Sequence, residues 1–226
     1  MAYTLTRLQL VTRGRRKADA VGDNHVTDTE LNDEVNDLIS RIWKEVFAVD
    51  RDRVAAVTSI TLTGAEEYTL PAAFMSLIRA DWVSGSQHVM LEPTTFAEMD
   101  LSDQAGAACY YRLVGGGQTG STERLHIRPD PGTGTIELWY ATTAPVLSAD
   151  GDTYDCRFDE HRYVIAGLAR FIAVKQETDP TPHEAEMLDA LEHVRTLARR
   201  RDAGRAKQIA DVRSLNLGWR ERLPDP

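Results

Sequence analysis

The sequence predicts an α+β fold: a helical bundle from both chain ends, an inserted small antiparallel β-sandwich or barrel, and an extended C-terminal arm. Apolar residues recur every three or four positions before residue 48 and after residue 159, which is the period of a half-buried helix. Between residues 54 and 147 the period falls to two and β-branched residues dominate, as is typical of strands. The chain then ends in a segment too short to build a core of its own.

The first predicted helix spans residues 27–48. Thr27 and Glu30 form a capping-box pair, in which each side chain accepts from the backbone N–H of the other residue. Polar residues separate the apolar positions that follow, so we expect one buried face. That face consists of Leu31, Val35, Leu38, Ile39, Ile42, Trp43, Val46 and Phe47.

The β insertion covers residues 54–147, with turns rich in glycine and proline between its strands. Their number and spacing favour a small antiparallel sandwich or barrel. The predicted strands are Val54 to Thr63, Glu67 to Leu70, Ser76 to Val83, Tyr110 to Val114, Arg124 to Arg128 and Thr135 to Thr142.

The second predicted helix, residues 159–178, is apolar on nearly all sides and must therefore be covered on several sides. At its start, Asp159-Glu160-His161 favours an N-terminal cap over an acid–base site, because adjacent helical residues point in different directions. The prolines at 180 and 182 end this helix, and a third helix spans residues 183–210. We assign the core of the second helix to Val164, Ile165, Leu168, Phe171 and Ile172.

These elements divide the chain into three parts. Residues 1–26 form an N-terminal segment, residues 27–212 a single domain, and residues 213–226 an extended docking arm. In the arm, Leu215, Leu217 and Trp219 alternate, so an extended chain presents them on one face. A disordered end gains nothing from such residues, and tryptophan is a common interface anchor. The residues that we assign to docking are Arg213, Leu215, Leu217, Trp219, Arg220 and Arg222.

The charge of the chain is unevenly distributed. The formal net charge is −9, which argues against nonspecific binding to nucleic acid, because that binding needs a basic surface. From residue 195 onward, however, nine Lys and Arg face four Asp and Glu. No apolar stretch approaches the length of a membrane span and no signal peptide is recognisable, so we expect a protein made in the cytoplasm without a membrane partner.

The motifs of enzymes and metal sites are missing from the sequence. The Gly115–Ser121 stretch lacks the lysine of a phosphate-binding loop and lies between two strands, which favours a hairpin loop. The six histidines show no pair at zinc-protease spacing. Cys109 and Cys156 have no metal-ligand partner nearby, and buried free thiols are favoured over a disulfide. We therefore expect no catalytic residue, no cofactor and no metal.

Four segments together resemble the phage head-to-tail adaptor family, which includes siphophage neck adaptors and the tail accessory factor of short-tailed phages. Each segment alone is weak, and their order and spacing carry the resemblance. They are Thr29 to Asn36, Tyr68 to Phe74, Leu125 to Pro131 before Ile136 to Tyr140, and Tyr163 to Asp179. The basic residues at 13–17 depart from the family pattern, since the segment before the first helix is longer and more basic than expected.

The resemblance implies a structural protein of the virion neck. Such adaptors form a homo-oligomeric ring, here expected to have 12 subunits, whose C-terminal arms reach into the portal. The other face binds a downstream stopper or tail protein, and DNA passes through the channel without sequence-specific binding. Two alternatives stay open: a neck stopper or tail-completion protein, and a cell-wall hydrolase.

Overall fold

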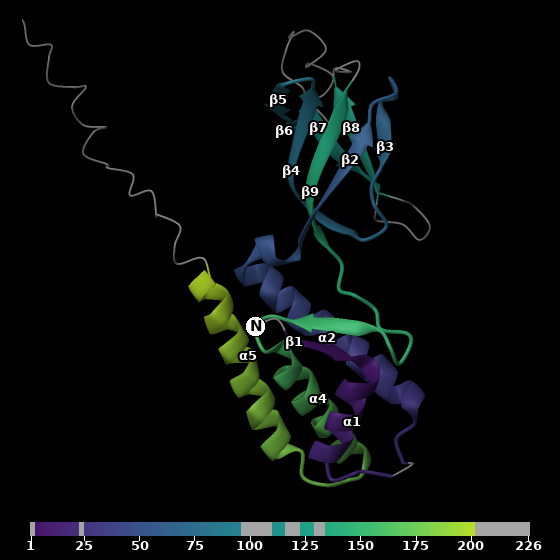
Figure 1. The fold of residues 1–226 in the computed structure, drawn as a ribbon, viewed down its shortest axis with the longest axis vertical. Helices are drawn as coiled ribbons and strands as arrows, with labels where there is room; N and C mark the ends of the chain where they lie inside the picture. The colour runs from purple at the N-terminus through teal and green to yellow at the C-terminus, as the bar shows by residue number, and fades with distance from the viewer. Residues whose placement is uncertain (1–2, 23–24, 96–109, 116–122, 129–133, 202–226) are drawn as a thin grey trace, which may run out of the picture.

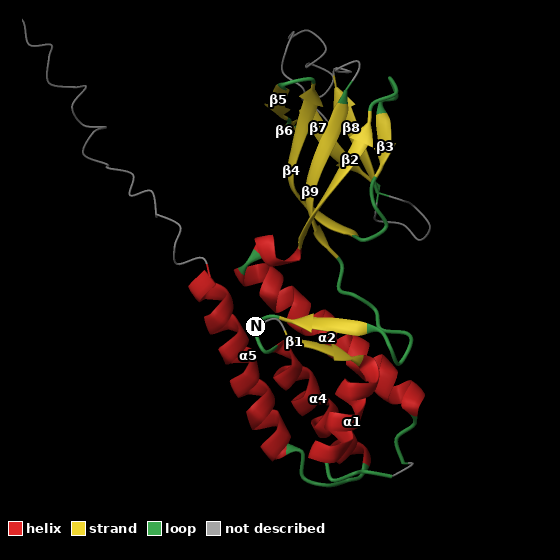
Figure 2. Cartoon of the chain, in the orientation of Figure 1, coloured by secondary structure: helices red, strands yellow, loops and turns green. Residues whose placement is uncertain are grey.

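The structure is a computed structural model of residues 1–226, and it describes residues 3–22, 25–95, 110–115, 123–128 and 134–201. The architecture is mixed α+β. The helices gather in one region and most strands in another, as Figures 1 and 2 show. The chain passes between the two regions near residue 50 and again near residue 143.

The helical region contains four helices within the described residues: α1 (Arg7–Lys17), α2 (Asp28–Val49), α4 (Glu160–Lys175) and α5 (Thr181–Arg201). The predicted capping box of α2 is confirmed, because the Thr27 hydroxyl accepts from the Glu30 N–H while the Glu30 carboxylate accepts from the Thr27 N–H. Residues 202–210, predicted as the end of the third helix, lie outside the described residues.

Helix α5 begins at Thr181, two residues earlier than predicted. The Asp179 carboxylate accepts from the Thr181 N–H at 3.0 Å, which satisfies one of the backbone donors that a helix start leaves free. Pro182 lies in the first turn, where the missing N–H of proline removes no helical hydrogen bond. The proline therefore belongs to the new helix and does not precede it.

Residues 1–26 contain two elements that the sequence pattern did not predict. Strand β1 (Tyr3–Thr6) pairs with β10 (Thr153–Cys156) in an antiparallel two-stranded sheet, and helix α1 follows at once. Thr6 and Gln9 form a second capping box, a signal that is readable in the sequence. The many basic residues of α1 concealed its short apolar face.

The expected cap at the start of α4 was wrong in its chemistry. Asp159 is the N-cap residue, but it has a left-handed φ of 60° and its side chain makes no capping hydrogen bond. Its carboxylate instead lies 3.5 Å from the His193 ring. The buried Glu160 carboxylate turns back to accept from the Phe158 N–H at 2.8 Å. The two adjacent carboxylates thus serve different partners.

Two glycines allow the helices to approach closely. A Cβ atom at Gly14 of α1 would lie 2.7 Å from Leu168 Cβ of α4, and one at Gly167 of α4 would lie 2.5 Å from Leu38 Cδ2 of α2. Both distances are too short for real carbon atoms. Leu168 of α4 therefore packs directly on the backbone of α1, and Leu38 of α2 packs directly on the backbone of α4.

The β region consists of two four-stranded sheets. One has the order β2 (Ala55–Thr61), β9 (Thr135–Thr142), β4 (Phe74–Ser84) and β5 (Gln87–Met90). The other has the order β3 (Glu67–Thr69), β8 (Arg124–Arg128), β7 (Tyr110–Val114) and β6 (Glu92–Pro93). All six predicted strands are present, whereas β1, β5, β6 and β10 were missed because they are too short to show a period.

One pairing corrects the expectation of an all-antiparallel insertion. Strand β6 runs parallel to β7, with Glu92 opposite Tyr110. Every other strand pair among the described residues is antiparallel. The exception covers only two residues, so the predominant character of the sheets agrees with the prediction.

Each region has its own apolar core. The helical core unites α1, α2, α4 and α5 with β10 and includes fully buried residues such as Leu31 and Leu168. The core of the β region draws Leu125 and Ile127 from one sheet and Ile136 and Leu138 from the other. Buried residues of both four-stranded sheets therefore belong to one apolar cluster.

Candidate docking surfaces

The six residues assigned to the docking arm, Arg213, Leu215, Leu217, Trp219, Arg220 and Arg222, lie outside the described residues. The structure does define where the chain leaves α5. Helix α4 is antiparallel to α5, because Arg162 lies near Asp189 and Arg170 near Glu184.

Helix α4 is also antiparallel to α2. Lys175, at the end of α4, donates to Glu30 at the start of α2, with 2.8 Å between Nζ and Oε1. Helices α2 and α5 consequently run in the same direction, and Arg195 of α5 binds Glu45 of α2 at 2.8 Å. The described end of α5 therefore lies beside the end of α2, on the side that leads to the β region (Figure 1).

The five residues assigned to the core of the second helix differ in burial. Val164, Leu168 and Ile172 are buried in the helical core, whereas Ile165 and Phe171 are only partly buried and pack at its margin. The Lys175 ammonium lies 5.6 Å from the Phe171 ring centre. Val174 is half exposed, so α4 has one open side and is not covered all round.

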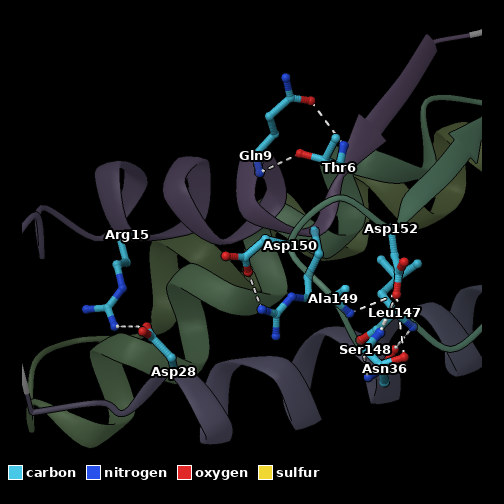
Figure 3. Close-up of polar contacts among 11 residues, drawn as sticks. Thr6, Gln9, Arg15, Asp28, Asn36, Leu147, Ser148, Ala149, Asp150 and Asp152 are labelled. Atoms are coloured by element: carbon cyan, nitrogen blue, oxygen red, sulfur yellow. Dashed lines mark hydrogen bonds and ion pairs between the residues drawn. The ribbon is translucent and has the colours of Figure 1, made fainter.

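A strap, residues 143–152, carries the chain from the β region back to the helices. Asn36 of α2 holds it by two hydrogen bonds to the Leu147 backbone, accepting from the N–H at 2.8 Å and donating to the carbonyl at 3.2 Å. Figure 3 shows this pair and, nearby, Asp150, whose carboxylate accepts from Arg7 of α1. The strap is thus fixed to α2 by hydrogen bonds to its backbone and to α1 by an ion pair with its carboxylate.

Asp152 closes the strap on itself. Its carboxylate accepts from the backbone N–H groups of Ala149 and Ser148 at 2.8 and 2.7 Å (Figure 3). These two hydrogen bonds, that of Ala149 first, lower the pKa of Asp152 below its usual value. The carboxylate therefore stabilises the turn in its charged form.

The junction between the two regions is held by buried polar contacts. Trp43 of α2 donates from Nε1 to the Thr142 carbonyl at 2.8 Å. Arg53, in the 3₁₀ turn η1 (Arg51–Val54), donates to the Asp155 carbonyl at 3.1 Å, and its side chain is only 9% exposed. Burial raises the pKa of the nearby Glu160 carboxyl. The junction is therefore a packed and hydrogen-bonded connection.

The outer face of the β2-β9-β4-β5 sheet exposes large apolar side chains. Val57 and Trp139 are directly opposite each other on β2 and β9, and they are 50% and 42% exposed. Next to them on β4, Arg79 donates to Asp81 at 2.7 Å, and this bond raises the pKa of Arg79. An exposed apolar pair on a sheet face is a candidate contact surface for another chain segment.

The basic residues at 13–17 lie on α1, and several of them are engaged within the chain. Arg15 binds the Asp28 carboxylate at 3.1 Å and Lys17 binds Glu186 of α5. Arg13 donates to the Tyr3 hydroxyl at 2.6 Å. Three basic residues occupy the last turn of α1, where positive charge interacts favourably with the helix dipole. This segment contributes to the fold of the helical region.

The described residues contain no group of histidines, cysteines and carboxylates that could hold a metal ion. Cys156 is a buried free thiol, and burial raises its pKa to about 12, which makes it a poor nucleophile. Cys109 and residues 116–122 of the glycine-rich loop lie outside the described residues. Among the described helices, none has the length and apolar character needed to cross a membrane.

Comparison with protein families adds the decisive observation. The family model described as SU10 adaptor protein matches residues 5–211. The chain belongs to this family of phage head-to-tail adaptors. The matched range includes both regions of the adaptor and ends just before the predicted arm. No curated protein matches the chain.

Membership fixes the general role of this adaptor. The family is one of structural phage proteins and is not a class of enzyme. It implies contacts with portal and tail proteins, an oligomeric state and a place in the virion. The family match supports a head-to-tail adaptor role in general terms.

Proposed function

We propose that this adaptor assembles into a ring of twelve copies under the portal and joins the portal to the tail at the neck of the virion. The observation that carries the proposal is the family match over residues 5–211. Identical wedges close a ring by heterologous contacts, in which each subunit's surface meets a different surface of its neighbour. The ring leaves a channel through which DNA passes without sequence-specific binding.

In this assembly the helices act as a bundle and the two four-stranded sheets as a sandwich-like insertion. The hydrogen bond from Trp43 of α2 to the Thr142 carbonyl of β9 supports this arrangement, since it joins the helical part to the β part. Arg53, just before β2, binds the Asp155 carbonyl of β10 beside the helices. Strap contacts from Asn36 and Arg7 tie the return of the chain to α2 and α1. A downstream stopper or tail protein binds the opposite face of the ring.

The C-terminal arm is the proposed portal contact. Residues 213–226 can reach about 45 Å when extended, at roughly 3.3 Å per residue. Leu215, Leu217 and Trp219 supply an apolar face with the two-residue period of a strand that adds to another protein's sheet. Arg213, Arg220 and Arg222 give the arm a positive charge, unlike the acidic chain as a whole.

Mass photometry of the adaptor with its phage's portal tests both parts of the proposal. The full chain is expected to add a ring-sized mass to the portal, and a chain ending at Val212 is expected to add none. A full-length variant with residues 213–226 in scrambled order, which keeps composition and charge, should behave like the truncated chain. Undiminished binding by the truncated chain contradicts the arm, and no binding by any form favours a neck stopper. A zymogram on bacterial cell walls tests the hydrolase alternative.

A further inference from the structure

Strand β2 has one edge without a partner among the described residues. It stands at the end of its sheet and pairs only with β9. The Leu62 N–H donates to the Gly134 carbonyl at 3.0 Å, and the register from Thr61 to Ala55 has no bulge. In an antiparallel pair the hydrogen-bonded residues alternate. The N–H and C=O groups of Val57, Ser59 and Thr61 therefore point to the open edge.

This edge lacks the features that usually protect an edge strand. Its seven residues, Ala55–Thr61, include no charge and no proline, although such residues normally prevent a further strand from adding. The edge strand of the other sheet, β3, is different. There Glu67 binds Arg124 at 2.8 Å, and the neighbouring Glu66 binds Arg128 at 3.3 Å. The contrast indicates that the β2 edge receives a strand.

The side chains beside the β2 edge show what kind of strand fits. Val57 and Trp139 form an exposed apolar pair on the outer face. A strand added to β2 would bring alternate side chains beside Val57 on that face. The matching strand therefore carries apolar residues with a period of two.

The chain's own C-terminal segment meets these requirements. Residues 213–219 equal β2 in length, hold Leu215, Leu217 and Trp219 at alternate positions, and include no acid. The segment also starts in the right place, because α5 runs parallel to α2 and α2 leads through η1 directly into β2. The 11 residues from 202 to 212 can bridge about 36 Å, and the tether keeps the local concentration of the segment high.

We propose that, in the free adaptor, residues 213–219 add to the open edge of β2 in the same chain. The arm is thereby stored on the β region, with its apolar residues against Val57 and Trp139. The portal then competes for the same backbone groups and side chains and releases the arm. The storage step stands independently, whereas the release step rests on the proposed function.

Residue-resolved amide hydrogen exchange on the free protein tests the storage step. The N–H groups of Val57, Ser59 and Thr61 are expected to exchange at least about tenfold more slowly in the full chain than in a chain ending at Val212. The N–H groups of Thr58 and Ile60, which the register assigns to β9, are the internal control and should not change. Equal exchange at Val57, Ser59 and Thr61 in the two chains would overturn the proposal.

A substitution that keeps the arm provides the second test. Ser59→Pro removes one N–H that points to the open edge and leaves the ladder to β9 intact, a position where edge strands tolerate proline. We expect it to remove the protection of Val57 and Thr61 while Thr58 and Ile60 stay protected. Protection that rises with protein concentration would instead assign the edge to a second copy. Because no portal is present, a negative result here leaves the portal-binding test of the proposed function unaffected.

Discussion

The helical region and the β region of this adaptor differ in how their packing and hydrogen bonding are completed. In the helical region, leucine side chains pack directly on the backbone of Gly14 and Gly167, and the side chains of Asn36 and Arg7 fix the strap. In the β region, the two sheets share a core, yet one sheet leaves an uncharged edge and an apolar pair at Val57 and Trp139 exposed. The helical region with its strap is thus a frame held by close packing and hydrogen bonds, whereas the β region carries a strand edge without a described partner beside an exposed apolar pair.

The largest loss of unfolding free energy is expected from a cavity in the helical frame. Leu168→Ala removes a fully buried side chain of α4 that faces Gly14, and such truncations cost about 2–5 kcal/mol of unfolding free energy. Leu188→Ala on α5 is the matched control, because Leu188 is 62% exposed, and it should stay within about 0.5 kcal/mol. Chemical denaturation at equal protein concentration measures both. Similar losses in the two variants would mean that α4 is not the centre of the frame.

A smaller loss of unfolding free energy is expected from removing the Asn36 side chain, which joins the strap to α2. Asn36→Ala removes both hydrogen bonds to the Leu147 backbone, and leaving such groups without partners costs about 1–3 kcal/mol. Asn32→Ala, one turn earlier on the same helix, is the control, because the buried Asn32 Oδ1 has no hydrogen-bond partner in the described structure. Thermal denaturation should therefore separate the two variants clearly. If both variants melt alike, the strap is held by its apolar residues alone.

The sequence was most informative where a long period or a capping motif could be read. Helix α2 and its capping box at Thr27 and Glu30 agree with the structure, as do strands β7, β8 and β9. Helix α1 was not predicted, because Gly14 and the basic residues interrupt its apolar pattern. The capping box of Thr6 and Gln9 was nevertheless a readable signal of its start. Strand β10 contributes only four residues, and its partner β1 is about 150 positions away, a pairing that no local pattern contains.

The candidate docking features also differ in whether a local sequence pattern predicts them or only the fold shows them. The arm is predicted from the alternation of Leu215, Leu217 and Trp219, which is a local signal. The open edge of β2 could not be found in this way, because it depends on which strand lies next to which. The strap contacts of Asn36 likewise join residues 111 positions apart. Sequence patterns thus identify what can dock, whereas the fold identifies where it can dock.

The mildest test of the frame is the response of the strap to pH. Hydrogen bonds from the Ala149 and Ser148 N–H groups lower the pKa of Asp152 below its usual value of 3.8. The folded state therefore favours the charged carboxylate, and its stabilising contribution is present above the unfolded pKa and is lost as pH falls through the lower, folded value.

Asp152→Asn carries no such charge, so this variant should melt below the parent protein at neutral pH. The difference in melting temperature is expected to shrink once the pH falls below about 4, because the parent then loses the stabilisation as well. Melting curves of the two proteins at a series of acidic pH values measure this difference in melting temperature. A difference that stays constant with pH would show that the turn depends on hydrogen-bond geometry and not on the charge of Asp152.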